Sequence, residues 1–327
     1  MRILLTGADG LLGNHLVRLL LQNNHEIRVL VQPNRNVPGL DGLAIEKIEG
    51  DLLHKDKLSG IAAGCDVIIH SAANTSVWPS RSKIVREVNV QGTLNLIEES
   101  KRSGIKKFIH VSSAAAFSPG TFSDPGDESR PYTSHKYKLD YIDSKYRAQE
   151  IVLKTSREDD FPAVVINPTF MIGPYDFTPS SGKMILAVYH RKTPGYPSGG
   201  RNFVYAGDVA QGIYNAIEKG KVGECYILGN ENLSYKQFFG KVSEITGVKP
   251  PALKLNCPVV TIFGLFQSAW GLLSGKIPDL SYRMARVSCD EHFYTPVKAV
   301  RELDLPQTPI DQAILETFNW FKDNQML

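Results

Sequence analysis

The first half of the chain alternates short apolar runs, rich in β-branched residues, with longer helical patterns. Runs that are apolar throughout predict strands buried on both faces, as in a parallel sheet covered by helices. The expected strands are Ile3 to Thr6, Ile27 to Val31, Val67 to His70, Phe108 to Ser112 and Ala163 to Ile166, and the expected helices are about Leu11 to Asn23, Ser82 to Arg102 and Ser134 to Ser156. This order predicts repeated β-α-β units, and therefore an α/β fold with a doubly wound parallel sheet.

After Pro168 the pattern changes to shorter elements separated by proline and glycine. A strand at Glu224 to Leu228 is expected to return to the sheet, and helices at Tyr235 to Thr246 and Pro309 to Asp323 are expected to cap a second region. We therefore predict a large sheet-containing domain from residues 1–168 and about 202–230. A smaller, mixed substrate-binding region is predicted from about residues 169–201 and 231–327. The length of 327 residues suits one large and one smaller domain.

Composition narrows the classes of protein that fit. Hydrophobic residues make up 42% and charged residues 22%, as in ordinary globular chains. The net charge of +3 is small and evenly spread, so nucleic acid is not an expected partner. The four cysteines lie far apart and include no CxxC pair, which predicts reduced thiols, no metal site and a cytoplasmic location. They are Cys65, Cys225, Cys257 and Cys289.

No secretory leader is recognisable at the start of the chain, and no transmembrane segment is expected. The most apolar segment, Val259 to Leu273, has 15 residues and contains Gln267 and Ser268. It falls short of the roughly 20 residues that cross a bilayer. We expect this segment to cover the substrate or to lie on the surface.

A glycine motif stands between the first expected strand and the first expected helix, where Thr6 is followed by Gly7, Gly10 and Gly13. In that context glycines permit a tight turn, let the backbone approach a diphosphate and let the helix pack on the sheet. The helix N-terminus attracts the phosphate charge. The sequence therefore predicts a Rossmann-type dinucleotide site at this turn.

The Gly-x-x-Gly-x-x-Gly spacing resembles that of the short-chain dehydrogenase/reductase superfamily, and other segments are similar to its motifs. Asp51-Leu52 resembles its adenine-contacting pair, His70-Ser71-Ala72-Ala73 its loop under the cofactor, and Asn89-Val90-Gln91-Gly92-Thr93 its helix-four motif. The resemblance implies cofactor contacts from Gly7, Gly10, Leu11, Leu12, Gly13, Asp51, Leu52, Ser71, Ala72, Ala73, Asn89, Tyr141, Lys145 and Pro168. For Asn89 it leaves two roles open, in a proton relay or in holding the cofactor loop.

The cofactor is expected to be NADP or NAD, with NADP favoured. An acidic residue after the second strand would bind the ribose hydroxyls of NAD, but Gln32 stands there. Glutamine does not repel a 2′-phosphate, and Arg35 lies three residues further on, where it could pair with one.

The chemistry is predicted from Tyr141 and Lys145, which lie four residues apart and therefore share one face of a helix. That spacing resembles the Tyr-x-x-x-Lys signature of the superfamily. It implies that the Lys145 ammonium lowers the pKa of Tyr141, which then acts as general acid or base. Ser113, after the fifth expected strand, resembles the serine that hydrogen-bonds the substrate oxygen. Tyr132 and Lys136 share the bare spacing but lack the flanking residues.

The chain as a whole resembles the dihydroflavonol-4-reductase-like branch of the extended, NAD-dependent epimerase/dehydratase members. The segments that carry this likeness are Asn167 to Asp176, Pro179 to Lys183, Phe203 to Ala210, Tyr226 to Gly229 and His292 to Tyr294. It implies reduction of a ketone or aldehyde of a small apolar molecule, with Thr75, Phe170 and Arg201 as candidate substrate contacts. Arg201 keeps open a nucleotide-sugar epimerase or dehydratase, and a non-catalytic cofactor sensor is a third reading. A homodimer is one possible assembly.

Overall fold

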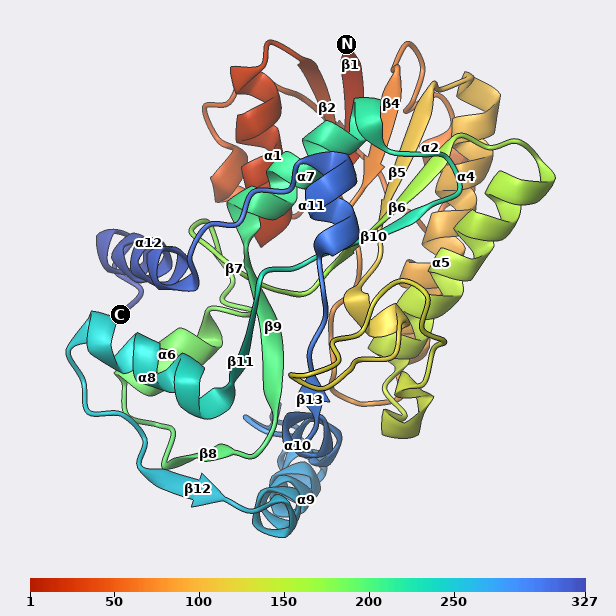
Figure 1. Ribbon diagram of the computed structural model, residues 1–327. Coiled ribbons are helices and arrows are strands. Elements are labelled where there is room, and N and C mark those ends of the chain that lie inside the picture. The colour runs from red at the N-terminus through yellow and green to blue at the C-terminus, as the bar shows by residue number, and fades with distance from the viewer.

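The large sheet has seven strands, all parallel, in a computed structural model that describes residues 1–327 (Figure 1). Its spatial order is β10-β6-β5-β4-β1-β2-β3. The strands are β1 Arg2–Thr6, β2 Glu26–Val31, β3 Glu46–Glu49, β4 Val67–His70, β5 Lys107–Val111, β6 Ala163–Pro168 and β10 Cys225–Leu228. The predicted parallel, doubly wound fold is confirmed, and the expected late strand returns to the sheet as β10.

Helices cover both faces of this sheet because alternate strand residues point to opposite sides. Ile3 and Leu5 of β1 belong to a core that is shared with α1 Leu11–Gln22, α7 Ala206–Lys219 and α11 Val297–Leu303. Leu4, between them, points into the other core, against α2 Lys55–Leu58, α4 Gly92–Ser103 and α5 Asp140–Glu158. Apolar clusters lie on both faces, which explains why most residues of the central strands are apolar.

A smaller sheet lies below the carboxyl ends of the large one (Figure 1). It contains β7 Phe170–Ile172, β9 Gly200–Tyr205, β11 Glu231–Ser234 and β13 Glu291–His292, and it is flanked by α6 Lys183–Tyr189, α8 Tyr235–Thr246 and α12 Ile310–Asp323. Strands β8 Gly195–Pro197 and β12 Leu253–Leu255 form a separate pair. At the foot of the molecule, α9 Cys257–Ser274 and α10 Tyr282–Cys289 pack as a helical hairpin (Figure 1).

Two elements cross the predicted division of the chain. Strand β9, which the boundary at about residue 202 divides, lies entirely in the small sheet. Helix α11 was assigned to the substrate-binding region, but its residues Ala299 and Leu303 pack with α7 in the core of the large sheet. The C-terminal third of the chain therefore contributes to both layers.

Two of the expected helices are interrupted. The helix expected at Ser82 to Arg102 divides into α3 Lys83–Arg86, a π-helical turn at Glu87–Gln91 and α4. The helix expected at Ser134 to Ser156 divides into a 3-10 turn at Ser134–Tyr137 and α5, because Lys138 adopts a left-handed conformation with φ of 53°. Two further short 3-10 turns occur at Pro38–Leu40 and Ala114–Ala116.

The expectation of four reduced thiols is wrong for one pair, since Cys257 and Cys289 form a disulfide. These residues are 32 apart in sequence, but the hairpin brings the start of α9 beside the end of α10, with 5.7 Å between the two Cα atoms. That separation is within the normal range for a disulfide. Cys65 and Cys225 are free and buried.

Candidate functional site

The glycine turn between β1 and α1 has little room for side chains at two of its three glycines. Gly7 has a φ of +72°, and a Cβ there would lie 2.6 Å from the amide nitrogen of Ala72. A Cβ on Gly13 would lie 2.0 Å from the carbonyl oxygen of Gly7. At Gly10 the nearest atom would be 3.5 Å away, which is ordinary contact. Gly7 and Gly13 are therefore required by packing, whereas a Cβ at Gly10 would fit without a clash.

The first turn of α1 can receive an anion. Gly10 is the N-cap and supplies no side-chain acceptor, and the first turn contains no acidic residue. The amides of Leu11 and Leu12 have no partner within the helix, because every helix leaves its first donors free. The helix dipole adds partial positive charge at the same place. The turn and the helix start therefore fit the diphosphate of a dinucleotide.

The ends of β1 and β4 are joined by buried hydrogen bonds at the next loop. The Thr6 hydroxyl lies 2.8 Å from Nδ1 of His70 and accepts a hydrogen bond from the Ala72 amide at 3.2 Å. Nε2 of His70 lies 3.0 Å from the Thr93 hydroxyl. Burial lowers the pKa of His70 to about 3, so this ring is neutral. The Ser71-Ala72-Ala73 segment is therefore held against the glycine turn.

Asn89 fixes the continuation of that loop. It is buried in the π-helical turn, where its side chain donates to the carbonyl of Asn74 and accepts from the Asn74 amide at 2.7 Å. It also donates to the Ser144 hydroxyl at 2.9 Å. Of the two roles left open for Asn89, this geometry favours holding the loop.

The expected adenosine side of the site lies at the carboxyl ends of β2 and β3. Asp51 accepts from the amide of Leu53, and the Leu52 carbonyl accepts from the side chain of Asn95. Gln32 and Arg35 are exposed, and the Arg35 guanidinium pairs with Asp9 of the glycine turn at 2.5 Å. Arg35 is thus held beside the predicted cofactor path.

Ser113, Tyr141 and Lys145 come from two elements that pack together. Ser113 follows β5 and caps the turn Ala114–Ala116, where its hydroxyl accepts from the Ala115 amide at 3.2 Å. The turn packs on α5, which carries Tyr141 and Lys145. The Lys145 ammonium donates to the Val111 carbonyl, two residues before Ser113. The fold therefore brings the predicted catalytic side chains to one end of the sheet.

The charge that affects the pKa of Tyr141 differs from the one that the sequence predicts. Burial raises the pKa of Tyr141, and the charge that opposes this rise is Arg201. Lys145 was expected to lower the pKa of Tyr141, but here its ammonium is directed to the Val111 carbonyl. Burial lowers the pKa of Lys145 itself to about 8.

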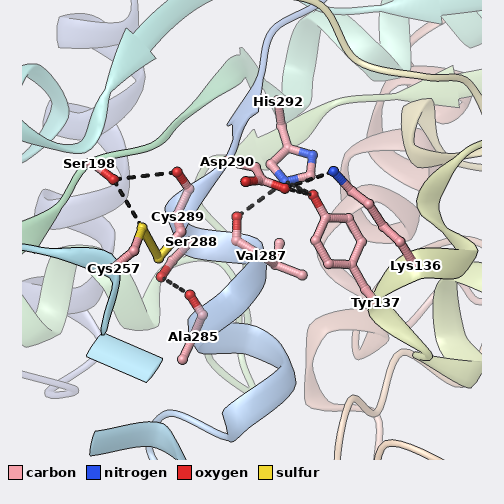
Figure 2. The surroundings of a disulfide bond; sticks show 10 residues. All are labelled: Lys136, Tyr137, Ser198, Cys257, Ala285, Val287, Ser288, Cys289, Asp290 and His292. Carbon is pink, nitrogen blue, oxygen red and sulfur yellow. Dashed lines mark hydrogen bonds and ion pairs between the residues drawn. A yellow bond between two sulfur atoms is a disulfide. The ribbon is translucent and has the colours of Figure 1, made fainter. Parts of the chain in front are cut away.

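Tyr132 and Lys136, which share the bare spacing, have structural partners instead. The Tyr132 hydroxyl donates to Asp143, and its ring stacks on Tyr146 with 4.1 Å between centroids. Lys136 pairs with Asp290 at 2.9 Å, as Figure 2 shows. Lys136 lies on the turn before α5 and Tyr132 precedes that turn, so neither is on the helix.

Two of the three candidate substrate residues meet in the small sheet. The Arg201 guanidinium lies 5.1 Å above the ring of Phe170, and its Nε donates to the Tyr235 hydroxyl at 2.8 Å. Phe170 follows Pro168, the last residue of β6, by two positions. Thr75 is exposed, on the loop that Asn89 holds, and the structure does not bring it to Arg201.

Sequence reasoning missed a buried polar cluster beside the disulfide. The Tyr137 hydroxyl donates to Asp290 and lies 3.4 Å from Nε2 of His292 (Figure 2). Although burial alone would raise the pKa of Asp290, hydrogen bonds from Lys136 and Tyr137 lower it overall. The sequence pointed to this cluster only through the segment His292 to Tyr294, which resembles the family but was assigned no function. The cluster couples the turn before α5 to β13.

Comparison with known proteins now defines the family. A sequence model of the NAD dependent epimerase/dehydratase family matches residues 3–229. The chain belongs to that family. It is therefore an enzyme of a nicotinamide-dependent family of oxidoreductases, epimerases and dehydratases. Its Rossmann-like α/β fold is the one that the β-α-β order predicts.

Individual relatives cover nearly the whole chain. A Synechocystis protein named "Putative dihydroflavonol 4-reductase" is 32% identical over 98% of this chain and 94% of its own length. Sterol demethylase protein B of Methylococcus capsulatus is 28% identical over the full length of both. The crystal structure of gox2253 is 34% identical, covers 99% of each chain and superposes with a TM-score of 0.87. The resemblance to the dihydroflavonol-reductase-like branch is thus confirmed.

Proposed function

We propose that this enzyme reduces the carbonyl group of a small apolar ketone or aldehyde, with Tyr141 as the proton donor. The observation that carries the proposal is the packing of α5 against the turn after β5, which gathers Ser113, Tyr141 and Lys145 at the carboxyl end of the sheet. A bound nicotinamide would supply the hydride. Ser113 would donate to the carbonyl oxygen, and Tyr141, whose pKa is raised, would keep its proton until that oxygen takes up negative charge.

The surroundings of Tyr141 support an apolar substrate. Its ring packs against a buried cluster that includes Ile142 and Val287, and Val77 and Met284 border the same cluster. Binding sites for small molecules are mostly apolar, with a few polar groups that orient the ligand. Two of the relatives carry names that refer to a dihydroflavonol and a sterol, both built on fused ring systems.

The cofactor that we propose is NADP, with NAD as the alternative within this NAD-dependent family. Arg35 lies beside the glycine turn and pairs with Asp9 there, so a small side-chain movement could bring it to a 2′-phosphate. Titration of both cofactors tests this. We expect NADP to bind about tenfold more tightly, a difference of about 1.4 kcal/mol. Arg35→Gln should remove the difference and leave NAD binding unchanged, whereas tighter binding of NAD by the parent enzyme would contradict the proposal.

A nucleotide-sugar epimerase or dehydratase is the second candidate, and Arg201 is the observation that favours it. Its guanidinium lies among aromatic side chains in the small sheet and shifts the pKa of Tyr141. A diphosphate would suit such a cation. The bond that Arg201 makes to the Tyr235 hydroxyl gives it a structural role as well.

Cofactor stoichiometry separates these functions. A reductase consumes one reduced cofactor per product, whereas an epimerase or dehydratase regenerates its cofactor in each cycle. We would incubate the enzyme with deuterated NADPH and a panel of apolar ketones and aldehydes, and in parallel with nucleotide sugars. Deuterium in an alcohol product supports the proposal. Conversion of a nucleotide sugar without net cofactor use would establish the second candidate.

A cofactor-sensing protein without catalysis would bind NADP and turn over neither panel, and that result would overturn both enzymatic proposals. The cytoplasmic location and a homodimeric assembly remain predictions from the sequence. Cell fractionation tests the cytoplasmic location. If thiols are trapped during fractionation, the same experiment tests whether Cys257 and Cys289 are paired in the cell.

A further inference from the structure

Helix α9 packs on the protein by a narrow stripe of mostly small residues. Val260, Gly264, Ser268 and Gly271 are its buried positions, three or four residues apart and thus on one face. A Cβ on Gly264 would lie 2.7 Å from the Cβ of Ala285 in α10. The Ser268 hydroxyl accepts from the Tyr282 amide at 2.8 Å. Small residues let α9 lie close against α10, and this leaves the larger side chains pointing outward.

The outer face of α9 is apolar and open. Nine large apolar side chains between residues 259 and 277 are each more than half exposed, and they account for nine of the 13 such side chains in the chain. They are Val259, Ile262, Phe263, Leu265, Phe266, Trp270, Leu272, Leu273 and Ile277. A continuous exposed apolar surface of this kind marks a site of interaction with protein or membrane. We call these nine residues the apolar face.

The charges near the apolar face indicate whether it contacts a protein or a membrane. Between residues 247 and 289 the chain has five basic residues and one acidic residue, Asp279. The basic residues are Lys249, Lys254, Lys276, Arg283 and Arg286, and none of them forms an ion pair with an acidic side chain. A second copy of this chain would bring like charges together. Anionic lipid headgroups would neutralise them, because the negative surface potential of such lipids attracts lysine and arginine.

We propose that the apolar face docks on the surface of a membrane that contains anionic lipid. Its aromatic and aliphatic side chains enter the boundary between headgroups and acyl chains, as in interfacial helices. In such helices the opposite face is usually charged, whereas here it is occupied by α10.

The surrounding structure favours a helix that lies on the membrane over one that crosses it. With 18 residues and a mean hydropathy of 1.4, α9 is by length and composition a candidate span. However, α10 packs against one side of it, and the disulfide joins its first residue to Cys289. Just before α9, strand β12 pairs with β8 in the body of the protein. Crossing would require α9 to leave these contacts.

The packed side of α9, opposite the apolar face, lies near the proposed catalytic site. A Cβ on Gly271 would lie 3.2 Å from the ring of Trp78, on the loop that Asn89 holds through Asn74. Met284 of α10 borders the cluster that contains the Tyr141 ring. Docking would therefore bring the substrate side of the enzyme toward the lipid, which suits an apolar substrate dissolved in it. This consequence rests on the proposed function, whereas docking itself does not.

Vesicle flotation with the full chain tests the proposal. We expect the protein to float with vesicles of phosphatidylcholine and phosphatidylglycerol, and to bind pure phosphatidylcholine at least about tenfold more weakly. Phe266→Ser combined with Leu273→Ser should weaken binding to anionic vesicles at least about tenfold. Phe122→Ser is the matched control, because Phe122 is similarly exposed, at 66% against 71% for Phe266, and lies outside the apolar face. It should float like the parent.

Tryptophan fluorescence reports where the contact forms. Trp270 is 64% exposed on the apolar face, so its emission should shift to shorter wavelength on anionic vesicles and be quenched by lipids brominated on the acyl chains. Trp270→Phe should remove most of this change while flotation continues.

Three results would overturn the proposal. One is failure of the parent to bind anionic vesicles. Another is equal loss of binding in Phe122→Ser. The third is a stable dimer that dissociates in the Phe266→Ser and Leu273→Ser variant without vesicle binding, which would assign the apolar face to a second copy. Vesicle binding by an enzyme that reduces no carbonyl compound would sink the proposed function and leave the docking standing.

Discussion

Lys145 is buried beside the end of β5, where its charge is poorly solvated, and its ammonium is satisfied by the carbonyl of Val111. Burial of a charged amine disfavours the protonated form. Its pKa of about 8 therefore lies close to the pH at which most enzymes work. If catalysis requires the charged form of Lys145, activity should depend on pH near this value.

We expect kcat/KM for carbonyl reduction to fall as the pH rises through about 8, because the free enzyme then loses the Lys145 charge. The raised pKa of Tyr141 keeps that residue protonated over the same range, so the fall reports on Lys145. The measurement is a pH profile of kcat/KM. Lys145→Arg keeps the charge at all these pH values and should flatten the fall in whatever activity it retains. An unchanged profile in that variant would assign the titration to another group.

Tyr141→Phe should lower turnover by at least about a hundredfold while leaving cofactor affinity nearly unchanged. The change removes the transferable proton and keeps the ring that packs beside Ile142. Steady-state kinetics and cofactor titration measure the two effects separately.

Tyr132→Phe is the matched control for that variant. It deletes the hydroxyl that donates to Asp143 and should cost about 1 kcal/mol of stability with little change in turnover. If Tyr132→Phe lost activity and Tyr141→Phe did not, the assignment of the proton donor would be reversed.

At this scale the sequence supplied candidate residues for the site but not their contacts. Ser113, Tyr141 and Lys145 could be proposed because their types and spacings are local. The ammonium of Lys145 was expected to act on Tyr141, yet Arg201, 60 positions after Tyr141 in the chain, is the cation that affects its pKa. The Tyr137 and Asp290 pair was missed for the same reason, since 153 residues separate the partners.

Among the elements, the turn between β1 and α1 shows that its glycines have different duties. Gly13 must lack a Cβ because backbone atoms of Gly7 and Ala8 occupy that volume, whereas a Cβ at Gly10 would make only ordinary contact with Gly7. The sequence motif treats the three glycines alike, and only the packing distinguishes them.

We expect Gly13→Ala to destabilise the protein by about 1–3 kcal/mol, since rigid backbone cannot yield to the new methyl group. Gly10→Ala should leave the melting temperature nearly unchanged and weaken cofactor binding about tenfold, because its methyl group would point to where the diphosphate approaches. Thermal unfolding and cofactor titration of both variants check this. Equal stability losses in the two would contradict the distinct roles.

Some elements of four or more residues were predicted closely, and the two-residue strand β13 was not. The expected helix at Tyr235 to Thr246 coincides with α8, and Val67 to His70 coincides with β4. Strand β13 has two residues and forms only because Gly200 and Arg201 lie beside it. No periodicity can be read from two residues, so the small sheet could not be predicted as a sheet.

Over the whole molecule, the substrate side is assembled from distant segments that meet around β9. Strand β7 pairs with β9 on one side, and β11 and β13 also pair with it. The disulfide stands where this assembly meets the helical hairpin, and the Ser198 hydroxyl lies 3.3 Å from Sγ of Cys257 (Figure 2). The sequence could not reveal the pair, because its proximity depends on α9 and α10 folding back on each other.

We expect the disulfide to stabilise the whole chain, not only the helical hairpin. Closing a loop with a separation of 32 residues reduces the freedom of the unfolded chain by about 3–4 kcal/mol in the loop-entropy estimate. Because Asp290, the next residue, is bonded to Lys136 and Tyr137, the base of the hairpin is tied to the main body and should unfold with it. Cys257→Ser should thus lower the melting temperature by roughly 5 °C.

Calorimetry of Cys257→Ser, Cys289→Ser and the double variant under oxidising conditions provides the check. If the bond is what stabilises the protein, the double variant should match either single one, because the second substitution removes nothing more. Additive losses would mean that each thiol acts through its own packing. A separate low-temperature transition confined to the hairpin, with the main transition unmoved, would show that α9 and α10 unfold independently of the sheets.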